Sequence, residues 1–203
     1  MSLDKIYIVH FEPLKERREF LTNALKKINY PYKFIINNLE SDLKTYKEVD
    51  YYYKGNKKPS IGEYCAGISH YNIYKDIIDN DYDTCLIIED DAVFCEDFDL
   101  ILKQVLLESK QYDFSFLSSC CNLHTEKTSE KWLYEVNSSR SVCGYIVNNS
   151  DNFKNLVFNF FPMTEVIDWY LYYIQAKFNL KYAWCEPPII TQGSETIYKS
   201  NLR

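Results

Sequence analysis

The sequence lacks any apolar run of the roughly 18 residues that a membrane-spanning helix needs. It also lacks a clustered basic stripe, and its formal net charge of -6 argues against a nucleic-acid-binding protein. The seven cysteines are odd in number and show no zinc-ligand spacing, and several lie inside apolar runs as buried thiols do. This pattern favours a reducing, cytosolic compartment. A first strand that begins near Lys5 leaves no room for a signal peptide, so we expect a soluble cytoplasmic protein.

Short apolar segments alternate with amphipathic segments along the first half of the chain. Residues 6–9, 32–36 and 84–88 have the composition of strands, and residues 61–78 have helical spacing of their apolar side chains. Pro13 is expected at the first position of the first helix. A strand, a helix and a second strand in this order predict a right-handed crossover and a parallel pair. The sequence therefore predicts an α/β sandwich with a mixed central sheet.

The second half is less regular. Residues 164–178 have helical spacing, and Thr164 fits the capping position of that helix. Gly144, inside an expected strand, indicates a bulge or a close approach by another segment. The tail from Gln192 onward is polar and is expected to form a loop or lid.

The most informative segment is the apolar run 84–88, which leads directly into Glu89, Asp90 and Asp91. Open α/β sheets bind ligands at the C-terminal ends of their strands. Three carboxylates at such a place repel one another unless a cation is present, and hard divalent cations prefer oxygen ligands. Alternation along an extended segment points Glu89 and Asp91 to one side and Asp90 to the other. Asp91, aided by Glu89, is therefore the expected cation ligand, and a solvated turn is the alternative.

A second candidate segment begins the helix at residues 61–78. Ser60 and Glu63 have the spacing of a capping box, which is a purely structural role. Gly67 is costly inside a helix and indicates that another group packs tightly against it. His70 lies about one turn further along, where a lone histidine is more often a core or surface residue than a functional one.

Arg17 and Asp168 complete the set of candidates. Arg17 lies with Arg18 on the first helix and either faces solvent or folds over the sheet edge toward a diphosphate. Asp168 lies beside two large aromatic residues near the start of a helix. It is either a first-turn acid that suits the helix dipole or a partly buried carboxylate that acts as a general base.

Three motifs in order resemble those of glycosyltransferase family 25, which includes lipooligosaccharide β-galactosyltransferases and collagen galactosyltransferases. They are residues 6–10 (IYIVH) followed by Arg17 and Arg18, residues 62–70 (GEYCAGISH) and residues 86–94 (LIIEDDAVF). Residues 144–147 and Asp168 extend the resemblance over most of the chain. The composition is also similar to that of giant-virus proteins, some of which belong to this family.

The resemblance implies a GT-A-like fold, a UDP-sugar donor, a glycan or protein hydroxyl acceptor, and inversion at the anomeric carbon. The acids 89–91 would replace the family's Asp-x-Asp motif, with Mn²⁺ or Mg²⁺ on Asp91 and Glu89 and with Asp168 as catalytic base. Residues 1–117 of a single domain, 1–203, would bind the donor, and residues 118–203 would serve the acceptor. The expected donor-binding residues are His10, Arg17, Asn37, Asn38, Ser69, His70, Glu89 and Asp90.

The chain departs from the family pattern at His10, where asparagine is usual, and it has no histidine after His124. Many GT-A enzymes supply a late histidine as a metal ligand, so metal dependence is an open point. Two other functions also stay open. One is a degenerate member that binds nucleotide-sugar without turnover. The other is a metal-dependent phosphatase or phosphotransferase, although its usual first aspartate is replaced here by Glu89.

Overall fold

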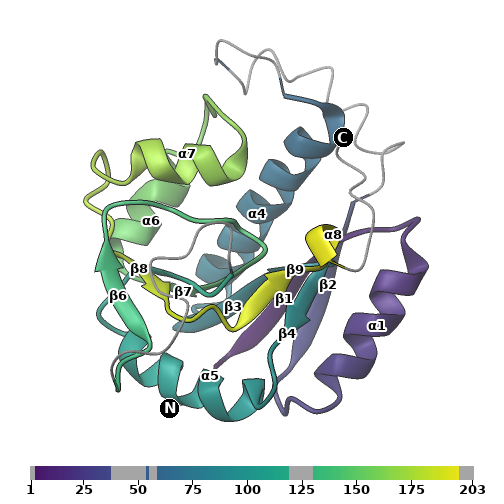
Figure 1. Ribbon diagram of the computed structural model, residues 1–203. Coiled ribbons are helices and arrows are strands. Elements are labelled where there is room, and N and C mark those ends of the chain that lie inside the picture. Colours follow the sequence, from purple (N-terminus) through teal and green to yellow (C-terminus); the bar gives the residue numbers. More distant parts are fainter. Residues whose placement is uncertain (1–2, 38–53, 55–58, 119–129, 197–203) are drawn as a thin grey trace.

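A seven-stranded sheet, in the order β2-β1-β3-β7-β5-β8-β6, forms the centre of the part of the protein that the computed structural model describes, residues 3–37, 54, 59–118 and 130–196 (Figure 1). Strands β2, β1, β3, β5 and β8 run in one direction, and β7 and β6 run in the other. The expected mixed, mostly parallel sheet is therefore confirmed. The strands are β1 (Lys5–Phe11), β2 (Tyr32–Asn37), β3 (Thr84–Glu89), β5 (Phe114–Phe116), β6 (Leu133–Val136), β7 (Gly144–Asn148) and β8 (Tyr182–Cys185).

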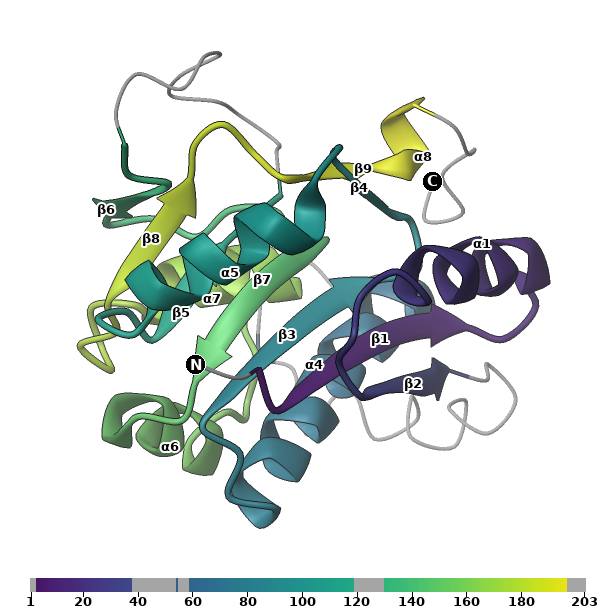
Figure 2. The same cartoon turned by 90° about the horizontal axis from the view of Figure 1, so that it is seen from below.

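Helices cover both faces of this sheet (Figure 2). Helices α1 (Lys15–Leu25) and α5 (Phe98–Ser109) pack on one face. Helices α4 (Ile61–Asp79), α6 (Asp151–Phe158) and α7 (Ile167–Ile174) pack on the other. The result is the three-layer α/β/α sandwich that the alternation of strands and helices predicts.

The central strands are buried on both faces because they carry apolar residues at odd and even positions. In β1, Tyr7 and Val9 belong to the core under α4, whereas Ile6 and Ile8 belong to the core under α1. Every residue of β3 except its last, Glu89, is buried. The polar end of β3 is therefore the first point along that strand at which the chain leaves the core.

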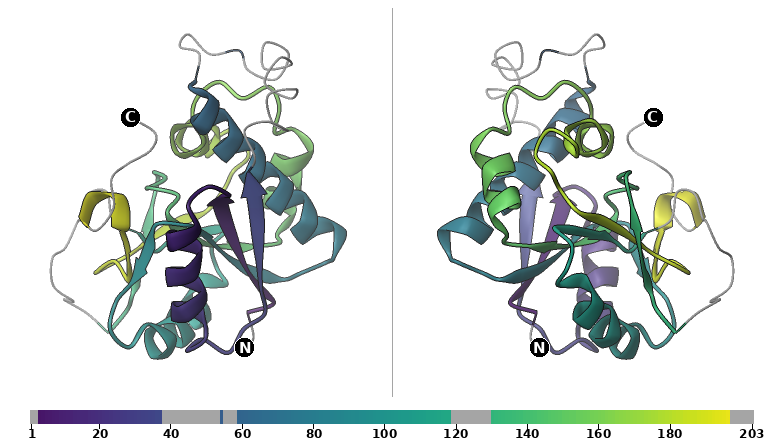
Figure 3. Two further views of the ribbon diagram at one scale, coloured as in Figure 1. Left: turned by 90° about the vertical axis from the view of Figure 1, so that its right-hand side faces the viewer. Right: turned by 90° about the vertical axis from the view of Figure 1, so that its left-hand side faces the viewer.

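A two-stranded sheet, β4 (Ala92–Phe94) with β9 (Ile190–Gln192), was not predicted. The short helix α8 (Gly193–Thr196) follows β9, so the expectation of a loop or lid from Gln192 is wrong as far as Thr196. Figure 3 shows α8 on the side of the sheet where α1 lies, opposite α4. Because Gly144 has no side chain, Ile190 of β9 can pack directly against it; a Cβ atom at this position would overlap Ile190 Cδ1. The predicted close approach at Gly144 is thus confirmed.

The start of α4 agrees with the prediction from the sequence. Ser60 Oγ accepts a hydrogen bond from the Glu63 backbone N–H at 3.3 Å, and a Glu63 carboxylate oxygen accepts one from the Ser60 backbone N–H at 2.7 Å. This is the predicted capping box. The expected tight packing at Gly67 is also confirmed, since a Cβ there would lie 2.8 Å from Met163 Cε.

Two helices begin later than predicted. Helix α1 begins at Lys15, so Pro13 precedes it instead of opening it. Helix α7 runs only from Ile167 to Ile174, and Val166 occupies its capping position, so the capping role expected of Thr164 is wrong. The apolar spacing over 164–178 continues beyond the helix because Phe178 and Leu180 belong to the same core.

No helix among the described residues has the length and apolar character needed to span a bilayer. The five cysteines that the structure describes are free thiols: Cys65, Cys85, Cys95, Cys143 and Cys185. Residues 38–53, 55–58 and 119–129 lie outside the described residues.

Candidate functional site

The three parallel strands β1, β2 and β3 end at one edge of the sheet, at Phe11, Asn37 and Glu89. This edge is where open α/β sheets bind their ligands. Asn37 is the last residue of β2, and Asn38 lies outside the described residues. The turn that leaves β3 brings Asp90 and Asp91 to the same edge.

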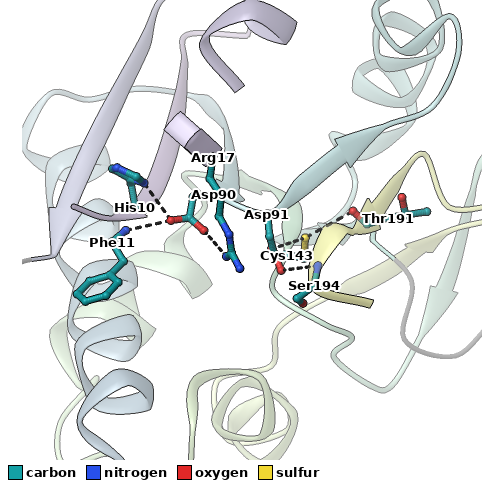
Figure 4. Close-up of polar contacts among 8 residues, drawn as sticks. All are labelled: His10, Phe11, Arg17, Asp90, Asp91, Cys143, Thr191 and Ser194. Carbon is teal, nitrogen blue, oxygen red and sulfur yellow. Dashed lines mark hydrogen bonds and ion pairs between the residues drawn. The ribbon is translucent and has the colours of Figure 1, made fainter. Parts of the chain in front are cut away.

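Asp90 and Asp91 point in different directions, as Figure 4 shows. Asp90 faces β1 and α1, whereas Asp91 faces Cys143 and the segment that leads into α8. Glu89 lies on the Asp91 side, because ligand atoms of Glu89, Asp91 and Cys143 all lie within 4.8 Å of one another. The predicted alternation of the three acids is therefore confirmed.

Cys143 was missed by sequence reasoning as part of this cluster. Its Sγ lies 3.5 Å from Asp91 Oδ1, and burial together with the nearby charges of Asp91 and Glu89 raises the thiol pKa well above its usual range. The thiol reaches the acids because β7 pairs with β3 so that Gly144 faces Ile88. The sequence carries no signal for this register, because the apolar neighbours of Cys143 indicate only a buried thiol.

The segment after β9 holds the other side of Asp91. The Gly193 backbone N–H donates to the Asp91 carbonyl at 2.6 Å, and the Ser194 backbone N–H donates to Asp91 Oδ2 at 3.3 Å. Residues about 100 positions apart in the sequence therefore meet at the acidic turn. The Asp91 main chain is thus held by Gly193, one carboxylate oxygen by the Ser194 N–H, and the other carboxylate oxygen lies next to Cys143.

Asp90 is buried in a cluster with two of the predicted donor-binding residues. His10 Nδ1 lies 2.9 Å from Asp90 Oδ2, and Arg17 Nη1 donates to Asp90 Oδ1 at 2.9 Å. The Phe11 backbone N–H donates to Oδ2 at 3.0 Å. Burial alone would raise the Asp90 pKa, but the hydrogen bonds from His10, Phe11 and Arg17 outweigh it and lower the pKa. These contacts tie α1 to the acidic turn, and a direct contact of His10, Arg17 or Asp90 with a nucleotide stays a prediction.

His70 is fully buried, and its ring lies next to the Glu89 carboxylate. Its Nδ1 lies 2.6 Å from Tyr145 Oη, which in turn lies 2.7 Å from Tyr74 Oη. Its Nε2 has no hydrogen-bond partner among the described residues and lies 3.8 Å from Glu89 Oε1. The two tyrosines therefore orient the ring so that one nitrogen points at the acidic cluster.

The charge of Glu89 is poorly compensated. Burial is the main cause that raises its pKa, His70 acts in the opposite direction, and the neighbouring charges of Asp91 and Asp90 raise it further. A carboxylate in this condition gains from a cation nearby. Two carboxylates fit a hard divalent cation, and the Cys143 sulfur is a softer third donor. The residues present therefore fit a divalent cation.

Asp168 is the second residue of α7 and is partly buried. Its Oδ1 accepts a hydrogen bond from the Trp169 backbone N–H at 2.9 Å. Burial is the main cause that raises its pKa, and the charges of Glu63 and His70 act on it in opposite directions. Asp168 is thus electrostatically coupled to the helix that carries His70.

Ser69 precedes His70 on α4. Its hydroxyl is buried and donates to the Cys65 carbonyl at 2.9 Å, within its own helix. The structure therefore brings together His10, Arg17 and Asp90 in one cluster, and Glu89, Asp91 and His70 in another, with Ser69 in neither.

Sequence reasoning also missed a buried ion pair. Arg140 Nη2 donates to Glu186 Oε1 at 2.7 Å, and both side chains are almost completely buried. The Arg140 guanidinium also lies 4.5 Å from the centre of the Trp184 ring. This pair joins the segment before β7 to the segment after β8, and its long sequence separation left no pattern to detect.

Comparisons with known proteins identify the family and the fold of the chain. The family model described as "Glycosyltransferase family 25 (LPS biosynthesis protein)" matches residues 3–182. The glycosyltransferase GlyE of Streptococcus pneumoniae has a similar structure, with a TM-score of 0.52 and 9% identity, over 99% of this chain and 55% of that chain. This likeness shows a GT-A-like fold and no more.

Two further solved structures are more distant. A protein from STIV matches with a TM-score of 0.47 and 13% identity, over 90% of this chain and 81% of that one. Mouse xyloside xylosyltransferase 1 matches with a TM-score of 0.41 and 7% identity, over 88% and 77%. A comparison with curated proteins finds no match.

Proposed function

The chain belongs to glycosyltransferase family 25, and we propose that it transfers a hexose from a UDP-sugar to a hydroxyl of a glycan or protein acceptor, with inversion. The observation that carries this proposal is the convergence of Glu89 and Asp91 at the C-terminal edge of the parallel strands. Lipopolysaccharide biosynthesis, which the family description names, is one process that would supply such an acceptor.

Asp91 and Glu89 would hold a divalent cation, Mn²⁺ or Mg²⁺, beside the donor diphosphate. When bound, the cation supplies charge compensation for the leaving group. Main-chain contacts from Gly193 and Ser194 keep Asp91 oriented toward this position. The contacts of Asp90 hold β1, α1 and the acidic turn in one arrangement, and this arrangement would form one side of the donor site.

Asp168 would take the proton from the acceptor hydroxyl as that oxygen attacks the anomeric carbon. A raised pKa suits a general base that must work near neutral pH. The bond from the anomeric carbon to the diphosphate breaks on the opposite face of the sugar, which inverts the configuration.

The first experiment combines calorimetry with UDP-sugars in the presence and absence of Mn²⁺ and a transfer assay on Asp91→Asn. We expect the substitution to abolish transfer while the circular dichroism spectrum stays native and the melting temperature does not fall. Asp97→Asn is the matched control, because Asp97 is exposed and lies shortly after the same turn. Its positive φ of 57° is one that asparagine adopts readily.

The same preparation separates the other functions. Donor binding without transfer or donor hydrolysis would identify a member that binds without turnover. Release of phosphate from a generic phosphate ester, with no UDP-sugar binding, would favour a phosphatase. Transfer that survives Asp91→Asn would overturn the assignment of the cation ligands.

A further inference from the structure

The outward face of α7 carries three aromatic side chains that the site described above does not use. Trp169, Tyr172 and Tyr173 are 55%, 42% and 58% exposed. Their ring centroids lie 6.0 Å apart for Trp169 and Tyr172, 6.3 Å for Trp169 and Tyr173, and 5.2 Å for Tyr172 and Tyr173. These three residues, called here the aromatic platform, form one continuous surface.

Helix α7 is apolar on both of its faces, which is unusual at a surface. Its inward face is buried in the core through Ile167, Tyr170, Leu171 and Ile174. A surface helix normally presents polar residues outward, and a contiguous exposed apolar patch usually marks a binding site. The aromatic platform is therefore a candidate binding surface.

We infer that the aromatic platform binds sugar rings of the acceptor, an inference that deepens the proposed function and rests on it. The platform begins at the residue after Asp168, and the Trp169 backbone N–H donates to Asp168 Oδ1. An acceptor whose hydroxyl reaches Asp168 must extend over neighbouring surface. The platform is such a surface, continuous with the proposed base.

The chemistry of the platform selects a neutral saccharide. Aromatic faces stack on the C–H faces of pyranose rings, and the tyrosine hydroxyls and the indole N–H can bond to sugar hydroxyls at the ring edges. Residues 169–173 (WYLYY) contain no charged side chain. Nothing in this segment would offset the charge of a phosphorylated or acidic sugar.

The test uses Trp169 as the reporter of binding. Its fluorescence is followed while neutral oligosaccharides, lactose and maltotriose first, are added to the native chain and to the double variant Tyr172→Ala/Tyr173→Ala. We expect the native chain to bind at least one saccharide of the panel and the double variant to bind it about tenfold more weakly, because two stacking rings are lost. Phe158→Ala, at a 77% exposed aromatic on α6, is the control and should bind as the native chain does.

Two sets of results would overturn the inference. One is a native chain that binds no saccharide of the panel, or a double variant that binds with native affinity. The other is a concentration-dependent dimer, seen by sedimentation, that the double variant abolishes, since the platform would then contact a second copy of the chain. Calorimetry with UDP-sugars on the same samples distinguishes the two proposals. Native donor binding with no saccharide binding refutes the platform alone, and a native chain without donor binding refutes the transferase.

Discussion

Replacing Glu89 by glutamine should stabilise the protein when no cation is bound. Burial, with the neighbouring charge of Asp91, raises the pKa of Glu89 in the folded state above its value in the unfolded chain. The folded protein therefore binds this proton more tightly than the unfolded chain does. The contribution of Glu89 to stability is most favourable below the unfolded pKa and is lost as the pH rises through the raised folded value.

The size of the effect follows from the spacing of the charges. Ligand atoms of Glu89 and Asp91 lie within 4.8 Å, and two ionised groups at that distance repel by about 3.5 kcal/mol at an effective dielectric constant of 20. Proton uptake and the 23% exposure of the Glu89 side chain relieve part of this repulsion. We therefore expect Glu89→Gln to raise the free energy of unfolding by about 1–2 kcal/mol at pH 7.5, which for a chain of this size raises the melting temperature by about 2–8 °C.

Thermal unfolding of both proteins in EDTA, from pH 4 to pH 8, measures this difference. The stabilisation should be largest at the alkaline end and should shrink toward pH 4, where Glu89 of the native chain takes up its proton. Adding Mn²⁺ should raise the melting temperature of the native chain more than that of the variant, because the cation binds the folded state through Glu89. Glu96→Gln, at an exposed acid after the same strand, should change neither quantity.

A Glu89→Gln variant that melts at or below the native temperature at pH 7.5 in EDTA would refute the reasoning. Such a result would mean that Glu89 is stabilised in its ionised form by groups of the protein. The acidic cluster would then have no need of a cation.

Two other substitutions test the groups that surround the cluster. Arg17→Met should lower the free energy of unfolding by about 3 kcal/mol, because it removes the guanidinium that pairs with the buried Asp90 and leaves only the contacts of His10 and Phe11, and Arg17→Met with Asp90→Asn should recover part of the loss in urea unfolding. Tyr145→Phe should cost about 1–3 kcal/mol more than Tyr74→Phe, because it takes the partner from both Tyr74 Oη and His70 Nδ1, whereas Tyr74→Phe leaves Tyr145 Oη in contact with His70. Equal losses of stability in the two tyrosine variants would contradict the hydrogen-bonded chain.

Local patterns were enough to predict β3, the capping box of α4 and the opposite orientation of Asp90 and Asp91. Each of these depends on residues that are neighbours in the sequence, so periodicity and spacing carry the information. Cys143 could not be predicted in the same way, since its position depends on the register of β7 against β3. The contacts of Ser194 with Asp91 depend likewise on the pairing of β4 with β9, two three-residue strands too short to show a pattern.

Asp90 and Asp91 are adjacent and chemically identical, yet their charges differ in how much they stabilise the fold. Three hydrogen bonds from His10, Phe11 and Arg17 stabilise the charged form of Asp90, so they outweigh burial, lower its pKa and make its charge favourable to the fold. Asp91 faces another carboxylate and a thiol, so the fold gains little from its charge. The turn after β3 thus carries Asp90, whose hydrogen bonds hold the turn in place. The same turn keeps Asp91 close to Glu89. A cation at this position would relieve the repulsion between Glu89 and Asp91, which is the physical basis of the proposed cation site.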